Sequence, residues 1–453
     1  MNITVKNIDE LNHVLLINIE KTDYSENVEK ELRNYRKKVN MPGFRQGKVP
    51  LGMIKKLYGR TIMVEEINKL VSDSITKHIV DNKLNLLGEP LPSEKEQKEI
   101  DWDNQENFEF AYDYAIAPEV KINLSKKNKI PYYKIKIDDK TLKTYIDNYR
   151  ARYGEYKIID EIKENELIEC TITEIKPEGE GLIVNDAKIL LSSFKDDKIK
   201  AKFVGKKNNG TITIDLKKAV GDNKTELAAL LHKKPEEIDQ ISNKFKIKIH
   251  KIKTFEKAEL NQDFFDKVYG ENVVKSETEF TEKIKEEIAN NYKADSDYRF
   301  RIDAKEKLTS TLDIKLPDNF LKRWLLISNK DSKNKLTQEQ IEKEYPLFAD
   351  DLKWQLIKET IIKEQNIKIT DEKITNAAKE FARYQFQQYG LGYVPEESLM
   401  QYVDELLKNK DEKRKIIDNE IEKAAVEWIK ETVKLNEKEI SYEEFNKLFE
   451  KNK

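Results

Sequence analysis

The sequence of 453 residues predicts a multidomain α+β protein with a small α+β N-terminal domain, a β-rich middle domain and an elongated all-α C-terminal domain. Three observations lead to this fold class. Strand and helix patterns are mixed near the N-terminus, strand and turn patterns prevail in the middle, and helical patterns prevail afterwards. We expect domains at 1–124, 161–253 and 254–453, with a linker strand and helix at 125–160.

The N-terminal domain is predicted from mixed signals. Apolar and polar side chains alternate from Phe108 to Ile116, as in a half-buried strand. Ser25 is a suitable N-cap, Pro50 suits the first turn of a helix, and Gly59 is a common residue at a helix end. The expected elements are strands at 2–8, 14–19 and 108–116, and helices at 25–40, 50–58 and 62–82.

A loop of ten residues, Met41–Pro50, interrupts the helical patterns. It contains two prolines, which restrict φ, and two glycines, which permit positive φ, so the loop should have a defined shape. Phe44 and Arg45 are neighbours at its tip. Aromatic and arginine side chains are the types that anchor interfaces, so the tip is a candidate docking site.

Basic residues gather around this loop. Between positions 33 and 60 there are nine basic residues and no acidic one, although the formal net charge of the chain is only −2. They are Arg33, Arg36, Lys37, Lys38, Arg45, Lys48, Lys55, Lys56 and Arg60. This segregation indicates an anion-binding surface, with phosphate as the expected anion.

Residues 43–50, Gly-Phe-Arg-Gln-Gly-Lys-Val-Pro, resemble the G-F-R-x-G-K-x-P motif of bacterial trigger factors, a family of ribosome-associated chaperones. The resemblance implies that the loop contacts the exit-port protein of the large ribosomal subunit and nearby ribosomal RNA. The residues it assigns to ribosome binding are Gly43, Phe44, Arg45, Gln46, Gly47, Lys48 and Pro50. Gln46 stands where many members have Lys or Pro. A basic surface turn without a partner is the alternative.

The same resemblance extends beyond the loop. It implies that residues 125–160 associate with the C-terminal domain. Within 161–253, strands are expected near 167–175, 182–184 and 211–214. The stretch from Phe203 to Ile214 resembles the late loop and strand of the FKBP-type prolyl isomerase fold, which trigger factors carry at this place.

The sequence predicts that the FKBP-like domain has no working proline pocket. Asp196–Lys200 stands where the family has the Ile-Pro-Gly-Phe-Glu stretch that lines this pocket. Isomerisation of this type needs an aromatic cage that twists and desolvates the amide. The only aromatic residues between 161 and 253 are Phe194, Phe203 and Phe245, about what a small core requires. We expect a degenerate domain without catalytic residues, and an active prolyl isomerase is the alternative.

From about Phe255 the chain is expected to be helical to its end. Ser276–Glu279 and Ser441–Glu444 are capping boxes, and Pro317 and Tyr345–Pro346 are expected to end helices. The expected helices are 276–312, 320–327, 337–345, 347–366, 370–389, 395–407, 411–435 and one from 441 onward. No fixed period supports a tetratricopeptide array.

One helical segment is unusually aromatic. The apolar residues of this segment are Phe381, Tyr384, Phe386, Tyr389, Leu391 and Tyr393, with Arg and Gln between them. They cannot share one narrow stripe at 100° per residue, so some should face solvent. Exposed apolar patches rimmed by polar side chains mark protein-binding surfaces. The segment is a candidate client-binding site, and ordinary helix packing is an equal alternative.

Composition narrows the function classes. The four histidines lack the spacing of metal ligands, and no Walker-type loop or hydrolase motif occurs, so we expect no metal and no cofactor. The single Cys170 excludes an internal disulfide and fits a reducing cytoplasm. No apolar run is long enough for a membrane span, and no secretory signal is visible.

The resemblance, together with the composition, therefore implies a cytoplasmic, ribosome-associated, ATP-independent chaperone that binds nascent and unfolded polypeptides and assists their folding. Catalytic prolyl isomerisation on nascent chains is the alternative, and a ribosomal RNA-binding factor without chaperone activity is a third hypothesis. Client preference, and whether the free protein forms a homodimer, are left open.

Overall fold

The computed structural model describes residues 1–330, 335–391 and 394–450. The chain divides into two compact units, each built from two segments. Unit 1 contains Met1–Tyr132 and Asp297–Lys438, and unit 2 contains Tyr133–Ser296 and Glu439–Lys453. The strand-rich region expected at 161–253 lies within unit 2.

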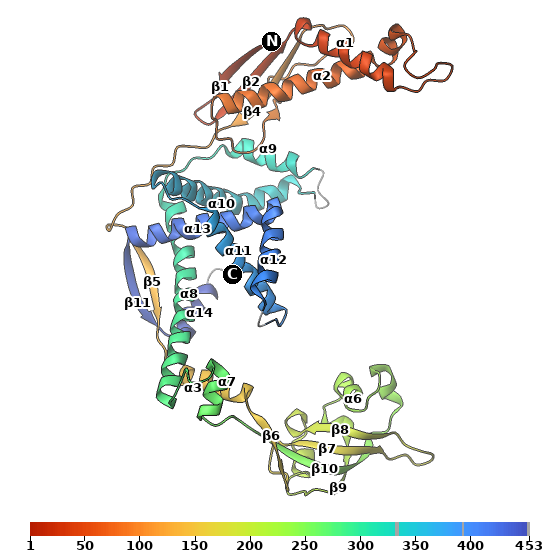
Figure 1. Ribbon diagram of the computed structural model, residues 1–453, viewed down its shortest axis with the longest axis vertical. Helices are drawn as coiled ribbons and strands as arrows, with labels where there is room; N and C mark the ends of the chain where they lie inside the picture. The colour runs from red at the N-terminus through yellow and green to blue at the C-terminus, as the bar shows by residue number, and fades with distance from the viewer. Residues whose placement is uncertain (331–334, 392–393, 451–453) are drawn as a thin grey trace. The chain divides into compact units, whose positions relative to one another are not determined.

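The N-terminal part of unit 1 is an antiparallel sheet of order β1-β2-β4-β3, with two helices packed against it (Figure 1). Its elements are β1 (Asn2–Asn7), β2 (Asn12–Ile19), α1 (Lys21–Lys38), α2 (Leu51–Asp81), β3 (Leu91–Pro92) and β4 (Phe108–Ala115). Ile17 of β2 is opposite Phe110 of β4, and both pack in one buried cluster with Ile67 of α2. The three strands predicted here are confirmed.

Two helix boundaries predicted in this part are wrong. The first helix begins at Lys21 rather than at Ser25, because the backbone N–H of Glu20 donates to the Asp23 carboxylate (2.8 Å) and closes the first turn. Gly59 does not end a helix, since α2 is continuous from Leu51 to Asp81. A helical glycine costs about 1 kcal/mol relative to alanine, and buried Ile54 and Ile62 on either side offset this cost.

The rest of unit 1 is helical. It contains the second part of α8 (Glu277–Thr311), α9 (Asp318–Ser328), α10 (Gln338–Glu364), α11 (Asp371–Gln388), α12 (Glu396–Lys408) and α13 (Lys410–Thr432). Trp354 of α10 packs in one cluster with Phe300 of α8 and Ile429 of α13. The prediction that Pro346 ends a helix is wrong, because α10 continues through it. Burial of the neighbouring Tyr345 and Ala349 offsets the lost backbone hydrogen bond.

Unit 2 contains a small helical cluster. It is formed by α3 (Asp139–Arg152), α7 (Gln262–Tyr269) and the first part of α8, and α14 (Tyr442–Glu450) begins at the predicted capping box. The Glu287 carboxylate accepts hydrogen bonds from the hydroxyls of Tyr149 (2.9 Å) and Tyr269 (2.8 Å). The pKa of the Tyr149 hydroxyl is raised to about 12. Desolvation is the largest cause, and the hydrogen bond to Glu287 is the second.

The expectation of helices only after Phe255 is wrong at one place. Residues Lys434–Ile440 form a strand, β11, which pairs with β5 (Lys129–Ile135). Most β11 side chains are exposed, so the segment has no alternating apolar pattern that would have indicated a strand.

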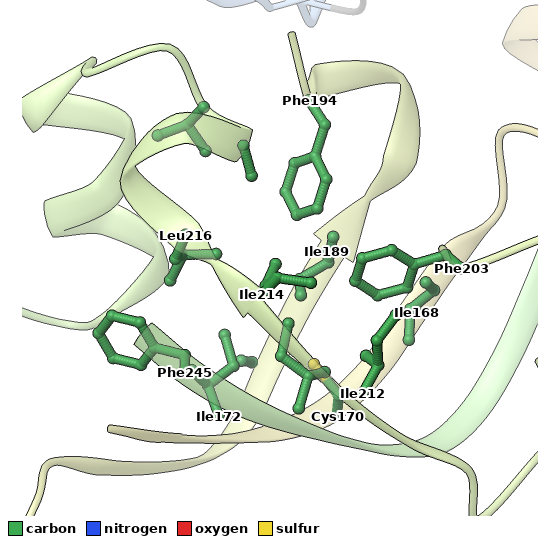
Figure 2. Packing of buried hydrophobic residues seen from close by; sticks show 14 of the residues in the cluster. Ile168, Cys170, Ile172, Ile189, Phe194, Phe203, Ile212, Ile214, Leu216 and Phe245 are labelled. Carbon is green, nitrogen blue, oxygen red and sulfur yellow. The ribbon is translucent and has the colours of Figure 1, made fainter. Parts of the chain in front are cut away.

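The middle sheet has the order β6-β10-β7-β8, and β9 also pairs with β10. Its elements are β6 (Glu155–Ile159), β7 (Leu167–Glu174), β8 (Ile183–Leu190), α4 (Asp197–Ala201), β9 (Thr211–Asp215), α5 (Leu216–Ala219), α6 (Lys224–Leu230) and β10 (Lys244–Glu256), with 3-10 turns at Leu191–Ser193 and Pro235–Gln240. Figure 2 shows the buried face, where Cys170 lies among isoleucine and phenylalanine side chains. Burial raises the pKa of the Cys170 thiol to about 12, so it is an inert core residue.

Candidate functional site

The loop between α1 and α2 consists of two successive turns. The Phe44 N–H donates to the Met41 carbonyl (3.1 Å), and the Lys48 N–H donates to the Arg45 carbonyl (2.9 Å). Gly43 and Gly47 occupy the third position of each turn with φ of +86° and +78°, as a type II turn requires. The Pro and Gly residues thus give the loop the defined shape that the sequence predicted.

Both ends of the loop are fixed by a small apolar cluster. Val49 is 1% exposed and packs with Leu32 of α1 and with Ile54 and Ile62 of α2. Partly buried Val39 and Met41, at the loop's start, join the same cluster. The loop extends past the adjoining ends of the two helices (Figure 1). The sequence interpretation missed these anchoring residues, although the apolar Val49 between Lys48 and Pro50 was an available signal.

The tip side chains are accessible. Phe44 is 38% exposed, and Arg45, Gln46 and Lys48 are exposed beside it. The Gln46 side-chain amide donates to the Lys38 carbonyl (3.4 Å), which ties the second turn to the end of α1. Of the remaining predicted docking residues, Gly43 and Pro50 are exposed and Gly47 is half-buried. Their role in docking stays a prediction.

The cations around the tip are largely unpaired. Arg33 pairs with Glu29 (3.2 Å) and Arg60 with Asp103 (3.1 Å). Within the part of the chain that the structure describes, the other seven have no ion-pair partner: Arg36, Lys37, Lys38, Arg45, Lys48, Lys55 and Lys56. A surface of this kind attracts anions because its positive potential is not neutralised locally.

Two apolar residues near the tip were not singled out from the sequence. Met53 and Leu57 of α2 are both exposed, and their i, i+4 spacing places them on one helix face beside Lys56. Their i, i+4 spacing next to two lysines was the sequence signal that could have identified them. The candidate docking surface therefore combines cations with more apolar area than Phe44 alone provides.

The aromatic segment at the end of α11 is mostly exposed. Tyr389 is 82% exposed, and Phe381, Tyr384 and Leu391 are also exposed. Phe386 is different, because it is half-buried and its ring packs against Tyr402 of α12 at 5.2 Å. Tyr393 lies outside the described residues. Helix packing thus explains the position of Phe386. For the four exposed side chains, client binding stays a prediction.

The phenylalanines of the middle domain are all used by its core. Phe194, Phe203 and Phe245 are each 2% exposed or less, and Phe194 and Phe203 pack edge to face with ring centroids 5.7 Å apart. Asp196–Lys200, the place of the family's pocket stretch, forms the N-cap and most of α4. A cavity of about 480 Å³ lies nearby, and its lining mixes apolar side chains, among them Phe194 and Leu190, with Asp186, Glu226 and His232. None of the three phenylalanines is exposed on the surface of this domain, and the absence of catalysis stays a prediction.

Residues 1–330, 335–391 and 394–450 contain no group of three His, Cys, Asp or Glu side chains arranged to hold a metal ion. In the same residues, no helix has both the length and the apolar character for crossing a bilayer.

Three protein-family profiles match successive parts of the chain. "Bacterial trigger factor protein" matches residues 1–149, "Probable trigger factor, FKBP-like domain" matches 156–257, and "Probable trigger factor, C-terminal domain" matches 296–449. The chain belongs to the trigger factor family. The fold class predicted from the sequence, with an α+β N-terminal domain, an FKBP-like middle domain and a helical C-terminal domain, is thereby confirmed.

Individual trigger factors are similar at low identity. The trigger factor of Francisella tularensis subsp. mediasiatica (strain FSC147) is 28% identical over 277 residues, which cover 59% of this chain and 58% of the relative. That of Rickettsia rickettsii (strain Sheila Smith) is 23% identical over 332 residues, covering 71% and 69%. The chain thus spans little more than half the length of the Francisella relative.

A solved structure has the same fold. It belongs to a study of promiscuous substrate recognition in folding and assembly by the trigger factor chaperone, and it superposes with a TM-score of 0.57 at 18% identity. The match covers 95% of this chain and 99% of the other.

The turn geometry of the trigger factor loop leads to a first prediction. Gly43→Ala should destabilise the loop by about 1 kcal/mol, because alanine is strained at positive φ although nothing lies within 4 Å of its Cβ position. Hydrogen–deuterium exchange of peptides covering residues 39–60 should become about fivefold faster. Gly52→Ala is the matched control, since Gly52 has equal space but lies in α2 without positive φ, and it should slow exchange. Equal behaviour of the two variants would contradict this account.

The buried phenylalanines lead to a second prediction. The intact chain should not accelerate the refolding of a proline-limited test protein, because no exposed aromatic cage is available to desolvate the amide. Fluorescence-detected refolding with a known prolyl isomerase as positive control measures this. Catalysis that disappears on deletion of residues 161–253 would show that the pocket is active in spite of its composition.

Proposed function

We propose that the chain is a cytoplasmic, ATP-independent chaperone that docks on the large ribosomal subunit and binds nascent and unfolded polypeptides. The observation that carries the proposal is the tip, where exposed Phe44 and Arg45 stand on a loop held by buried Val49. An aromatic ring beside a guanidinium suits a protein surface that borders RNA, because the ring can be desolvated while the cation pairs with phosphate.

The surrounding charge supports the RNA side of this partner. Seven cations without ion-pair partners in the described residues surround the tip, and phosphate is the dominant charge on ribosomal RNA. The exposed Met53 and Leu57 support a ribosomal protein as a further partner, because a protein surface can bury apolar side chains that RNA would leave exposed to solvent. The exit-port protein and the RNA beside it are the proposed partners.

Polypeptide binding is assigned to the aromatic segment of the C-terminal domain. Phe381, Tyr384, Tyr389 and Leu391 are large apolar side chains that remain exposed, with Arg383 and three glutamines between them. Such a surface can accept many sequences, because tyrosine offers both apolar area and a hydroxyl at low entropic cost. Since the sequence carries no nucleotide-binding motif, binding and release are proposed to be an unassisted equilibrium.

The docking prediction concerns the two tip residues. Phe44→Ala combined with Arg45→Ala should reduce co-sedimentation with ribosomes at least about tenfold, because both the apolar anchor and the central cation are removed. Suppression of aggregation of an unfolded client in solution should not change. Binding of the wild type should also weaken as salt rises.

The matched control for docking is Lys77→Ala with Val80→Ala. It removes an exposed cation and an exposed apolar side chain from the other end of α2. This variant should co-sediment like the wild type. Undiminished co-sedimentation of the tip variant at moderate salt would refute the docking role.

The client prediction concerns three exposed residues. Tyr384→Ser, Tyr389→Ser and Leu391→Ser together should reduce aggregation suppression several-fold, because about 1 kcal/mol or more of apolar contact is lost at each position. Light scattering during dilution of a denatured client measures this. Leu347→Ser is the control, because Leu347 is also exposed but lies in α10 outside the aromatic segment. Equal effects of the two variants would contradict a specific client surface.

A further inference from the structure

The middle sheet has one buried face and one outward face. Along β10, Phe245, Ile247, Ile249 and Ile252 are buried, and the positions between them point outward. The outward residues of β10 are Lys244, Lys246, Lys248, His250, Lys251, Lys253 and Phe255, with a β-bulge between Ile249 and Lys251. Polar residues are expected on the solvated face of an antiparallel sheet, and Phe255 departs from this rule.

Phe255 belongs to a group of outward apolar side chains, which we call the apolar shelf: Tyr156, Ile158, Leu167, Leu190 and Phe255. Tyr156 of β6 is paired with Phe255, and their ring centroids are 5.2 Å apart. Ile158 is in register with Lys253, Lys253 with Leu167, and Leu167 with Leu190, so one row crosses the strands β6, β10, β7 and β8. Leu167 is half-buried and the other four are exposed, with Ile158 at 63%.

Lys253 does not interrupt the shelf. Its Nζ lies 2.6 Å from the Oε1 of Glu169, and both side chains are largely covered. The charge is therefore neutralised at the edge of the row, and the methylene stem of the lysine adds apolar surface.

The rest of the outward face contains a lysine strip: Lys188, Lys244, Lys246, Lys248 and Lys251. Thr171, Thr173, Ile183 and His250 lie among these lysines. No salt bridge involves these five lysines in the described part of the chain. Two carboxylates lie in register with the strip, but both have other partners: Glu169 pairs with Lys253, and Asp215 accepts from the backbone of Lys218 at the start of α5. The strip is positive, although acidic and basic residues are nearly balanced in the whole chain.

The shelf also borders an unpaired strand edge. β6 is the first strand in the order β6-β10-β7-β8 and has no partner strand on its other side within the described residues. An edge strand offers backbone N–H and C=O groups to any extended chain that lies beside it.

We propose that this outward face binds an extended polypeptide segment that has apolar side chains at alternate positions and acidic side chains next to them. The inference deepens the proposed function, because it assigns a second client site and a client chemistry. Apolar side chains would cover the shelf, acidic ones would reach the lysine strip, and the backbone would align with β6. Single-stranded RNA would use the lysines and two rings but would not require the aliphatic Ile158, Leu167 and Leu190 or the strand edge.

The test is a binding titration of the full chain by fluorescence anisotropy. The probes are two labelled peptides that alternate valine and threonine, one ending in several glutamates and the other in several lysines. The wild type should bind the acidic peptide at least about tenfold more tightly than the basic one. A short single-stranded oligoribonucleotide is the third probe and should bind more weakly than the acidic peptide.

Two variants test the contributions of the apolar shelf and of the lysine strip to peptide binding separately. Tyr156→Thr with Ile158→Thr and Phe255→Thr should weaken binding of the acidic peptide at least about tenfold, and threonine retains β propensity. Lys246→Glu with Lys248→Glu should reverse the preference between the peptides. Val204→Thr is the matched control, since Val204 is 51% exposed in the same domain but lies outside the strands, and it should bind like the wild type. If circular dichroism shows that the triple variant is unfolded, Ile158→Lys alone replaces it.

Several outcomes would overturn the inference. They are unchanged peptide binding by the shelf variants, no preference between the peptides, tighter binding of the oligoribonucleotide, or a change in self-association alone by analytical ultracentrifugation. The Tyr384, Tyr389 and Leu391 variant is titrated in parallel. Loss of binding only in that variant would refute the shelf and leave the proposed function standing. If peptide binding is lost only in the shelf variants, and the wild type does not suppress aggregation, the shelf would be supported and the proposed function refuted.

Discussion

Burial of Val49 between α1 and α2 is the constraint on which the candidate docking tip depends. The loop could otherwise fold back and cover Phe44, because exposed aromatic rings gain free energy by burial. Val49, Val39 and Met41 instead occupy the apolar space between the helices, together with Leu32 and Ile54. The two turns between these anchors are short, and their geometry leaves Phe44 and Arg45 at the outer end. The exposed tip is thus a consequence of a small, well-filled core beneath it.

The sequence predicted those features that depend on neighbouring residues. The strands β2 and β4 follow from alternation, the turns of the loop follow from Pro42, Gly43 and Gly47, and the cap of α14 follows from Ser441. The candidate docking residues were accessible to prediction for the same reason, because a short motif carries them.

Features that depend on distant residues were not predictable in this way. Gly59 and Pro346 are local helix breakers, yet both lie inside helices because burial of flanking side chains outweighs their cost. β11 was missed because its partner β5 lies about 300 residues earlier and its own side chains are mostly exposed. Likewise, only the strand register reveals that Tyr156, Leu167 and Leu190 lie on one face, since they come from three separate segments.

The tip and the aromatic segment differ in the physical force that each would use in the proposed function, and this difference matters because the sequence carries no nucleotide-binding motif. The proposed attraction between the tip and phosphate would act over roughly 8 Å at physiological salt and would weaken as salt rises. The proposed client contacts to exposed Tyr384 and Tyr389 would be apolar, would act only at short range and would not require charge. Because the two interactions respond to different properties of their partners, a client could leave the aromatic segment as it buries its own apolar residues, without any change at the tip. Folding of the client itself would then supply the free energy for its release.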